Sequence, residues 1–273
     1  MRGARWSSIG VVALALLASF IAPPSAARAE DWIVTVGARL GGAPPYEGAN
    51  HDVLWPTPSF SLHHADRPRR FTPPDDGNTV AVVSTRHIDL GPVLRFRGSR
   101  GDTGSLQGFD KVDIAVEPGV FVDVWPADWI RGRIEARHGF FGYDGYVGDA
   151  GIDLIRTGRR WDASIGPRIG YGDANYMDTY FGVTPQEAAM SPYIKTPYEP
   201  GAGQRYLGAE TAFSYHINDH WRTIVDFGYH RLAAKAADSP IIPVAGDLNQ
   251  YSASFGFTYS FGLHTGKKAP PAS

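Results

Sequence analysis

The sequence predicts an all-β protein, a transmembrane antiparallel up-and-down β-barrel, from the period of its side chains and the lengths of its connections. Residues 251–261 alternate large apolar with small polar side chains, a period of two that only a strand sorts onto two faces. Their eleven positions are about what a tilted strand needs to cross the hydrocarbon layer of a membrane. Similar segments recur along the chain, and short turns alternate with long loops, as in bacterial outer-membrane barrels.

The N-terminus has the pattern of a secretory signal peptide over residues 1–29. Two arginines precede an apolar run at residues 9–22, and an A-x-A cleavage site ends at Ala29. The apolar run is shorter than the roughly 20 residues of a spanning helix, so we expect cleavage rather than a membrane anchor. The barrel is then expected over residues 30–261, followed by a flexible C-terminal tail at 262–273.

Composition excludes several classes of function. The chain has no cysteine, which removes disulfides, thiolate metal sites and a lipidated cysteine. Without the three arginines of the signal segment, 26 − 3 = 23 basic side chains face 28 acidic ones, and this net charge of −5 argues against nucleic acid as a partner. No apolar run after the signal approaches helix-spanning length, so a mature chain that enters a membrane does so as a closed barrel.

The alternation predicts which side chains share a face of each strand. Strands are expected to begin near residues 32, 112, 161, 205, 221 and 251. The expected outward set is apolar or aromatic on most of them and includes Trp32, Val120, Val122, Ile165, Arg205, Leu207, Phe213, Val225 and Phe255. The opposite face between residues 112 and 124 carries several carboxylates and needs water or opposite charge.

The connections predict which end of the barrel is which. Tight turns are expected at 126–128, 157–160 and 218–220, and longer loops near 41–52, 98–110, 173–203 and 232–247. Short turns are typical of the periplasmic side. Four tryptophans fall where an interface girdle on that side is expected, namely Trp32, Trp129, Trp161 and Trp221. Strict alternation places Trp129 with the charged Arg131, so either a bulge shifts the register or Trp129 is not a girdle residue.

About twelve strands are expected, with ten as the alternative, because barrels with both termini inside have even strand numbers. The weakest segment is a short strand around Arg69 to Thr72, which Pro73 and Pro74 interrupt. A soluble sandwich or lipocalin-like barrel is the alternative fold. In that fold the aromatic face would be a core rather than a lipid-facing surface.

Several segments together resemble the MltA-interacting protein and OmpV family of outer-membrane proteins. They are Tyr180-Phe181-Gly182-Val183-Thr184, Arg231-Leu232, Asp238-Ser239-Pro240-Ile241, Leu90-Gly91-Pro92-Val93-Leu94, Tyr46-Glu47-Gly48 and the aromatic strand from Phe255 to Phe261. The resemblance runs across nearly the whole mature chain, in order and in spacing.

This resemblance implies a protein of the Gram-negative outer membrane without known catalysis. One member is described as a scaffold between a lytic transglycosylase and a peptidoglycan synthase, so the implied partners are murein hydrolase or synthase proteins, besides outer-membrane lipid. The alternative roles are a narrow porin-like channel and a surface adhesin. We therefore expect no catalytic residues and no cofactor.

Charged side chains on the inward faces are the candidate lumen residues: Asp113, Glu117, Asp123, Arg131, Arg133, Glu135, Asp162, Arg168, Glu210, Arg222 and Asp226. They either line a solute pathway or pair with one another and hold the barrel shut. We favour pairing, because an unpaired charge in a narrow lumen is costly.

No metal site or enzyme motif is predicted. His216 and His220 have helical zinc spacing, but they flank a hairpin turn and no third ligand is identifiable. The segment Pro74 to Asn78 lacks the ligand pattern of a calcium loop and is expected to be a turn. No G-x-S-x-G or H-E-x-x-H motif occurs.

Two further segments have a functional and a structural interpretation. His63, His64 and the arginines at 67, 69 and 70 form a basic cluster, expected to be a solvated turn rather than a lipopolysaccharide or murein contact. The long loop 173–203 carries aromatic side chains at Tyr176, Tyr180, Phe181, Tyr193 and Tyr198. It is expected to be a packed plug or cap, with specific binding as the alternative.

Overall fold

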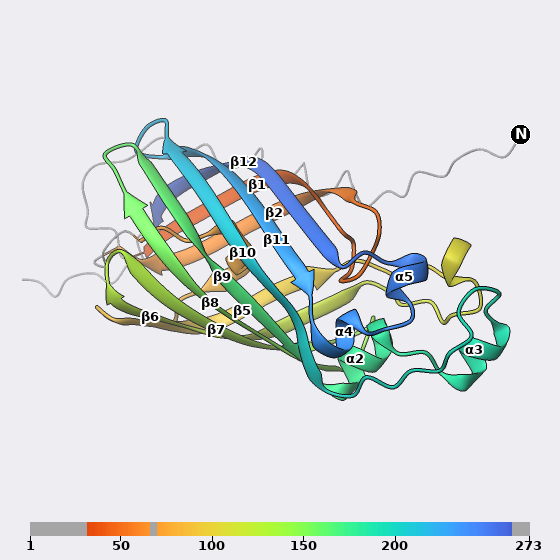
Figure 1. The fold of residues 1–273 in the computed structure, drawn as a ribbon. Coiled ribbons are helices and arrows are strands. Elements are labelled where there is room, and N and C mark those ends of the chain that lie inside the picture. Colours follow the sequence, from red (N-terminus) through yellow and green to blue (C-terminus); the bar gives the residue numbers. More distant parts are fainter. Residues whose placement is uncertain (1–31, 66–69, 264–273) are drawn as a thin grey trace, which may run out of the picture.

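The computed structural model describes residues 32–65 and 70–263, which form a closed β-barrel with short helices at one end (Figure 1). The expected signal peptide, residues 1–29, lies outside the described residues, as do residues 264–273 of the expected tail. The last strand continues to Leu263, so the barrel extends slightly beyond its expected end at position 261.

The strand count agrees with the sequence. Twelve strands are described: β1 (Trp32–Ala43), β2 (Val53–His64), β3 (Asn78–Val80), β4 (Val83–Ser84), β5 (Ile88–Arg97), β6 (Ala115–Ala127), β7 (Ile130–Gly139), β8 (Gly145–Thr157), β9 (Trp161–Gly172), β10 (Gly203–His216), β11 (Trp221–Leu232) and β12 (Asn249–Leu263). Eleven of them close the ring, in which β12 pairs with β1, while β4 lies outside it along β5.

The ring departs from a pure up-and-down order at β3. This strand pairs in parallel with β2 and antiparallel with β5. The reason is that residues 70–77 run back inside the barrel, where Asp76 bonds Arg131, so the chain re-enters the wall in the direction of β2. The short strand expected around Arg69 to Thr72 is wrong, since residues 70–72 form no strand and position 69 lies outside the described residues.

Outward side chains of the wall are apolar and inward ones are polar, as the alternation predicts. On β6, Val120 and Val122 are exposed, whereas Phe121, which lies between them, and Asp123, which follows them, are buried. Exposed large apolar side chains continue around the ring on Ile134, Ile152, Leu154, Ile165, Leu207, Phe213, Val225, Phe227, Phe255 and Phe257. A continuous apolar outer surface over a polar interior is typical of a transmembrane barrel, and the soluble-core alternative is wrong.

Two bulges shift the alternation. Between β6 and β7 the register shifts between Val124 and Ala127, and Trp129 lies in the turn, exposed, while Arg131 points inward. Between β9 and β10 it shifts between Gln204 and Tyr206. The expected outward position of Arg205 is therefore wrong: its side chain is buried inside the barrel, because one extra residue in a strand reverses the face of the residues before it.

The barrel has a turn end and a helical end. Tight turns join β6 to β7, β8 to β9 and β10 to β11 at the expected positions. The other end carries α2 (Ala174–Phe181), α3 (Pro185–Met190), α4 (Ala234–Ala237), α5 (Ile242–Ala245) and the 3-10 turn η2 (Gly104–Leu106), while η1 (Pro74–Asp76) lies in the lumen. No helix in the described part of the chain is long and apolar enough to span a membrane.

Candidate functional site

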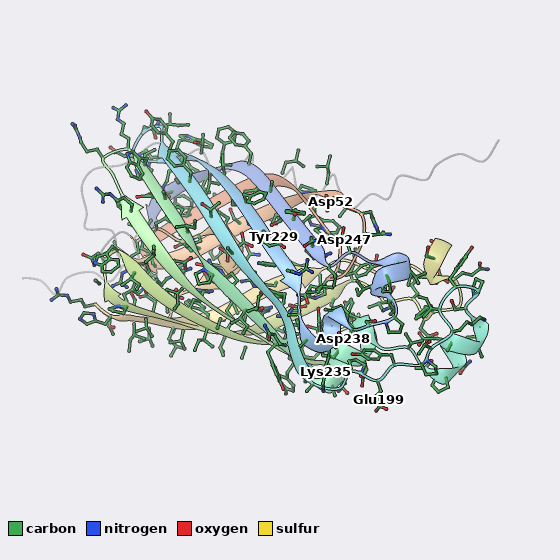
Figure 2. All side chains as sticks on the ribbon, viewed as in Figure 1. Asp52, Glu199, Tyr229, Lys235, Asp238 and Asp247 are labelled. Atoms are coloured by element: carbon green, nitrogen blue, oxygen red, sulfur yellow. The ribbon has the colours of Figure 1, made fainter. Side chains whose placement is uncertain are left out.

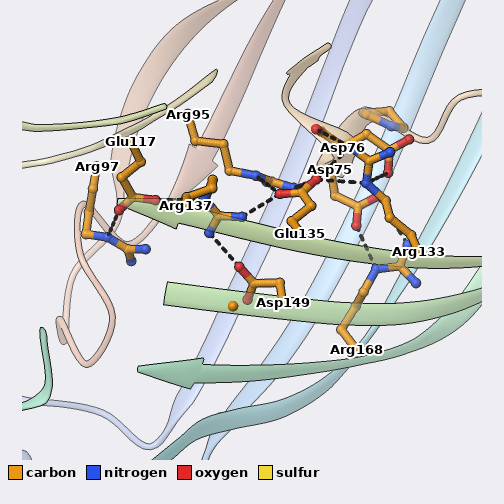
Figure 3. A network of polar contacts seen from close by, with 12 residues as sticks. Asp75, Asp76, Arg95, Arg97, Glu117, Arg133, Glu135, Arg137, Asp149 and Arg168 are labelled. Atoms are coloured by element: carbon orange, nitrogen blue, oxygen red, sulfur yellow. Dashed lines mark hydrogen bonds and ion pairs between the residues drawn. The ribbon is translucent and has the colours of Figure 1, made fainter. Parts of the chain in front are cut away.

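The candidate site is the charged lumen, built mainly on β7. Alternation along this strand directs Arg131, Arg133, Glu135 and Arg137 inward one after another. Figure 3 shows the last three of them. Glu135 accepts hydrogen bonds from Arg133 Nε at 2.8 Å, from Arg137, and from Arg95 Nε at 2.9 Å. One buried carboxylate is thus shared by three guanidinium groups from two strands.

The segment of residues 70–77, here called the lumen segment, is held inside the barrel by charge. Asp76 accepts from Arg131 Nη1 at 2.5 Å and Nη2 at 2.8 Å. Asp75 accepts from Arg168 Nε at 2.7 Å, and the carbonyl oxygen of Pro74 accepts from Arg39 Nη2 at 3.0 Å. Side chains of β1, β7 and β9 therefore hold the same short segment inside the barrel.

A second group of ion pairs joins the wall strands to the loops and helices of the helical end. Arg205 bonds both Asp149 and Glu47, and Arg97 Nε donates to Glu117 at 2.7 Å. The hydroxyl of Tyr176 on α2 donates to Glu47 Oε2 at 2.9 Å. The bulge turns Arg205 inward, and its guanidinium group then links strand β10 to Glu47, which also contacts α2.

The remaining inward carboxylates also have side-chain partners. Asp226 accepts from Arg39 Nη1 at 2.9 Å, and Glu210 Oε1 lies 3.0 Å from His230 Nε2. Asp153 bonds both Arg131 and Arg168. Pairing offsets the large desolvation cost of a buried charge, and removing one partner leaves the other uncompensated. The arrangement agrees with the interpretation that these charges pair with one another.

Aromatic side chains close the helical end. Tyr176, Tyr180 and Phe181 of α2 are buried, and the Tyr143 ring meets that of Tyr176 edge-on at 5.0 Å. Asp173 caps α2 by accepting from the backbone N–H of Tyr176, so the helix begins directly after β9. Burial raises the pKa of Tyr180 to about 12, which keeps its phenol neutral. The loop 173–203 thus supplies a cap, as expected, and only Tyr193 among its tyrosines is strongly exposed.

Apolar side chains close the turn end. Phe71 of the lumen segment packs with Trp125, Ile155, Ala212 and Ile224 in one buried cluster. A cavity of about 300 Å³ remains between this cluster and the cap, lined by Arg95, Asp149, Glu210 and other charged residues. The lumen therefore contains polar space that both ends cover.

The structure places most of the expected lumen residues together. Glu117, Asp123, Arg131, Arg133, Glu135 and Arg168 belong to the charged network, with Glu210 and Asp226 on the opposite wall and Asp162 buried near the turn end. The expected lumen position of Asp113 is wrong, because this residue precedes β6, is exposed and pairs with Lys111 at 3.3 Å. Arg222 lines a smaller cavity at the turn end.

The other candidate residues take structural positions. His216 lies 2.6 Å from Asp162, and His220 contacts the carbonyl oxygen of Ser260 at 3.0 Å. Within residues 32–65 and 70–263, no three His, Asp or Glu side chains are placed to share a metal ion. Arg70 pairs with Asp89 at 2.7 Å rather than joining a solvated cluster, while positions 67 and 69 lie outside the described residues.

Sequence reasoning missed half of the network. Asp75 and Asp76 were expected only in a turn, and Glu47, Arg95, Arg97, Asp149 and Asp153 were not singled out. Their positions in loops, or on strands with weaker alternation, hide them. The available signal was the row of arginines on one face of β7, which predicts carboxylates elsewhere in the lumen to pair with them.

Comparison with known proteins identifies a family. Residues 36–261 match the family model described as MltA-interacting protein MipA. Among solved structures, an outer-membrane channel from Pseudomonas putida F1 has a TM-score of 0.43 at 10% identity, over 88% of this chain and 100% of that chain. The NanC porin has 0.37 at 11%, over 84% and 98%.

The outer-membrane protease OmpT from Escherichia coli has a TM-score of 0.33 at 8% identity, over 87% of this chain and 99% of that one. No curated protein matches the chain.

Proposed function

The chain belongs to the MltA-interacting protein MipA family, and from this premise we propose that it is an outer-membrane scaffold for a periplasmic enzyme of murein turnover. The observation that carries the proposal is a lumen obstructed along its axis. An ion-paired segment lies within it, aromatic residues pack at one end, and an apolar cluster packs at the other. A barrel built this way offers its surfaces, rather than its interior, to a protein partner. We propose no catalytic role and removal of residues 1–29 on export.

The turn end is the surface proposed for the partner, because short turns of outer-membrane barrels face the periplasm. Arg156, Arg159 and Arg160 at the β8–β9 turn are exposed, and none has a carboxylate partner among the residues described. The helical end is different: Figure 2 shows Asp52, Glu199, Asp238 and Asp247 there, all exposed. The basic β8–β9 turn favours a partner with an acidic patch.

The test is binding of the refolded barrel to a purified membrane-bound lytic transglycosylase. Replacing Arg156, Arg159 and Arg160 with glutamate should weaken binding at least about tenfold, since three attractive charges become repulsive. The matched control replaces three lysines of the helical end, Lys111, Lys195 and Lys235, with glutamate and should leave binding unchanged. Absence of wild-type binding, or equal loss in both variants, contradicts the scaffold.

A narrow channel is the second candidate, favoured by the polar cavity of about 300 Å³ in the lumen. Conductance of the wild-type barrel in planar bilayers decides between them. Steady ion current would favour a channel, because ion flow needs an axial path past the lumen segment. Absence of ion current through the wild-type barrel, together with transglycosylase binding, would favour the scaffold.

A further inference from the structure

The wall of the barrel is incomplete between β2 and β5 toward the helical end. Residues 53–60 of β2 pair with β1 alone in the described chain, since β3 reaches only Ser61 and Leu62. On the other side, β3 pairs with Val93 and Leu94, and the next three residues of β5 pair with β6 alone. Beyond β3, therefore, no backbone ladder joins these two strands.

A cavity of about 330 Å³ lies at this gap and reaches from the wall to the lumen. Its outer part is apolar and is lined by Pro44, Pro45, Val53, Trp55, Pro58, Leu94 and Phe96. Its inner part is charged and shares Asp75, Arg95, Arg97, Glu210 and Ser252 with the lumen cavity. Because both ends of the barrel are covered, this gap is a sideways route into the polar interior.

Trp55 differs from the other inward aromatic side chains of the wall. It lies opposite Gly41 in the β1–β2 ladder, two residues from Thr57, which lies opposite the inward Arg39. Trp55 therefore occupies the inward face, yet its side chain is 46% exposed, whereas the inward Phe121 and Trp125 are each 3% exposed. An exposed indole beside an apolar lip is a surface for a hydrocarbon chain.

Arg95 is the cation at the inner end of the gap. Its side chain is 28% exposed, whereas its carboxylate partner Glu135 is 1% exposed and also binds Arg133 and Arg137. Glu135 would thus remain neutralised if Arg95 turned to another anion. A guanidinium binds carboxylates and phosphates through paired, charge-assisted hydrogen bonds.

We propose that the gap between β2 and β5 is a lateral binding site for single-chain amphiphiles with an anionic head, entering from the surrounding lipid. The hydrocarbon chain lies between Trp55 and Phe96, and the head group binds Arg95. The site differs from the turn-end surface of the proposed scaffold, so failure of one proposal leaves the other unaffected. Fatty acids and lysophospholipids share this chemistry.

The test uses stearate with a nitroxide label near its head, and its neutral methyl ester, added to the refolded barrel in phosphatidylcholine nanodiscs. Spin resonance should show a saturable immobilised fraction with stearate that binds about tenfold more tightly than the ester, as expected for one charge-assisted contact. R95Q should remove that difference. R156Q, which deletes an exposed arginine at the turn end, should preserve it. Equal binding of acid and ester, or an unchanged preference in R95Q, overturns the proposal.

A second variant guards against misfolding of R95Q. The chain has no native cysteine, so Thr57→Cys with Phe96→Cys places one thiol on each side of the gap. The unbridged double variant lacks the Phe96 ring and should bind stearate more weakly but still saturably. Bridging the two thiols with a bifunctional maleimide should abolish that binding. Heat-modifiability on a gel checks that each protein is folded. Binding that survives bridging also overturns the proposal, whereas a labelled lysophosphatidylglycerol that competes identifies phospholipid as a source.

Discussion

Arg131 donates two hydrogen bonds to Asp76, and this pair ties the lumen segment to the wall strand β7. Both side chains are 1% exposed. Arg131 also bonds Asp153, so one guanidinium holds the lumen segment and the adjacent strand β8 together. The contact joins residues 55 positions apart in sequence and anchors the chain where it leaves the wall.

Asp76→Ala should destabilise the barrel by about 3–5 kcal/mol, because the buried guanidinium groups of Arg131 and Arg133 each lose a carboxylate. The measurement is the free energy of unfolding in urea with the protein in lipid vesicles. Asp75→Ala is the matched control: Asp75 is 25% exposed and pairs with Arg168, so its removal takes a carboxylate from one arginine rather than two, and we expect less than half that loss. Equal losses would mean that the Arg131 pair does not anchor the segment.

Two tryptophans near the same turn should differ in their contribution to stability. Trp125 is 3% exposed, and its indole donates to Asp89 at 3.1 Å, whereas Trp129 is 60% exposed. Trp125→Ala should cost about 3–5 kcal/mol by opening the apolar cluster at the turn end. Trp129→Ala should cost less than half of that, measured by the same urea unfolding. A larger loss at Trp129 would contradict the bulge and the outward position that it creates.

The cap should weaken in alkali through Tyr180. Its pKa is raised to about 12 in the folded state by burial, against about 10 when unfolded. Above pH 10 the unfolded chain loses the proton first, so the stability held below pH 10 falls as pH rises toward 12, by up to about 2.7 kcal/mol. Measured by urea unfolding from pH 9 to 12, Tyr180→Phe should flatten this decline.

At neutral pH the same variant has a second expected outcome. The Tyr180 hydroxyl is buried and has no hydrogen-bond partner among the described residues. Its removal should leave stability unchanged or raise it by about 1 kcal/mol, because an unpaired buried hydroxyl is costly. A clear loss at pH 7 would reveal a partner for this hydroxyl.

A pair of glycines tests how the barrel closes at β3. A Cβ at Gly91 on β5 would stand 1.7 Å from the carbonyl oxygen of Val80, while one at Gly132 on β7 would meet no atom within 4 Å. Gly91→Ala should therefore cost about 1–3 kcal/mol by forcing the strands apart, and Gly132→Ala should cost less than about 1 kcal/mol. Unfolding free energies check both, and the prediction fails if the two substitutions cost the same.

Much of the wall was predictable from local sequence. Inward positions such as Glu117, Asp123 and Arg133 follow from alternation, because successive side chains of a strand point to opposite faces whatever the strand packs against. The tight turns follow from the interruptions of the same periodicity. The expected count of twelve strands included one around Arg69 to Thr72, whereas the short strands of this region are β3 and β4. Arg205 shows the limit: its inward position depends on a bulge between Gln204 and Tyr206, and an extra residue leaves no mark on the hydrophobic pattern.

The sequence by itself determined the class of the fold, which side chains share a face on most strands, and where the chain turns, since these are properties of neighbouring residues. Only the tertiary structure decided that Asp76 fills the lumen against Arg131, that Glu135 serves three arginines, and that β2 and β5 leave a gap beside Trp55. Those contacts join distant segments, and closure of the ring sets which inward side chains meet across the lumen.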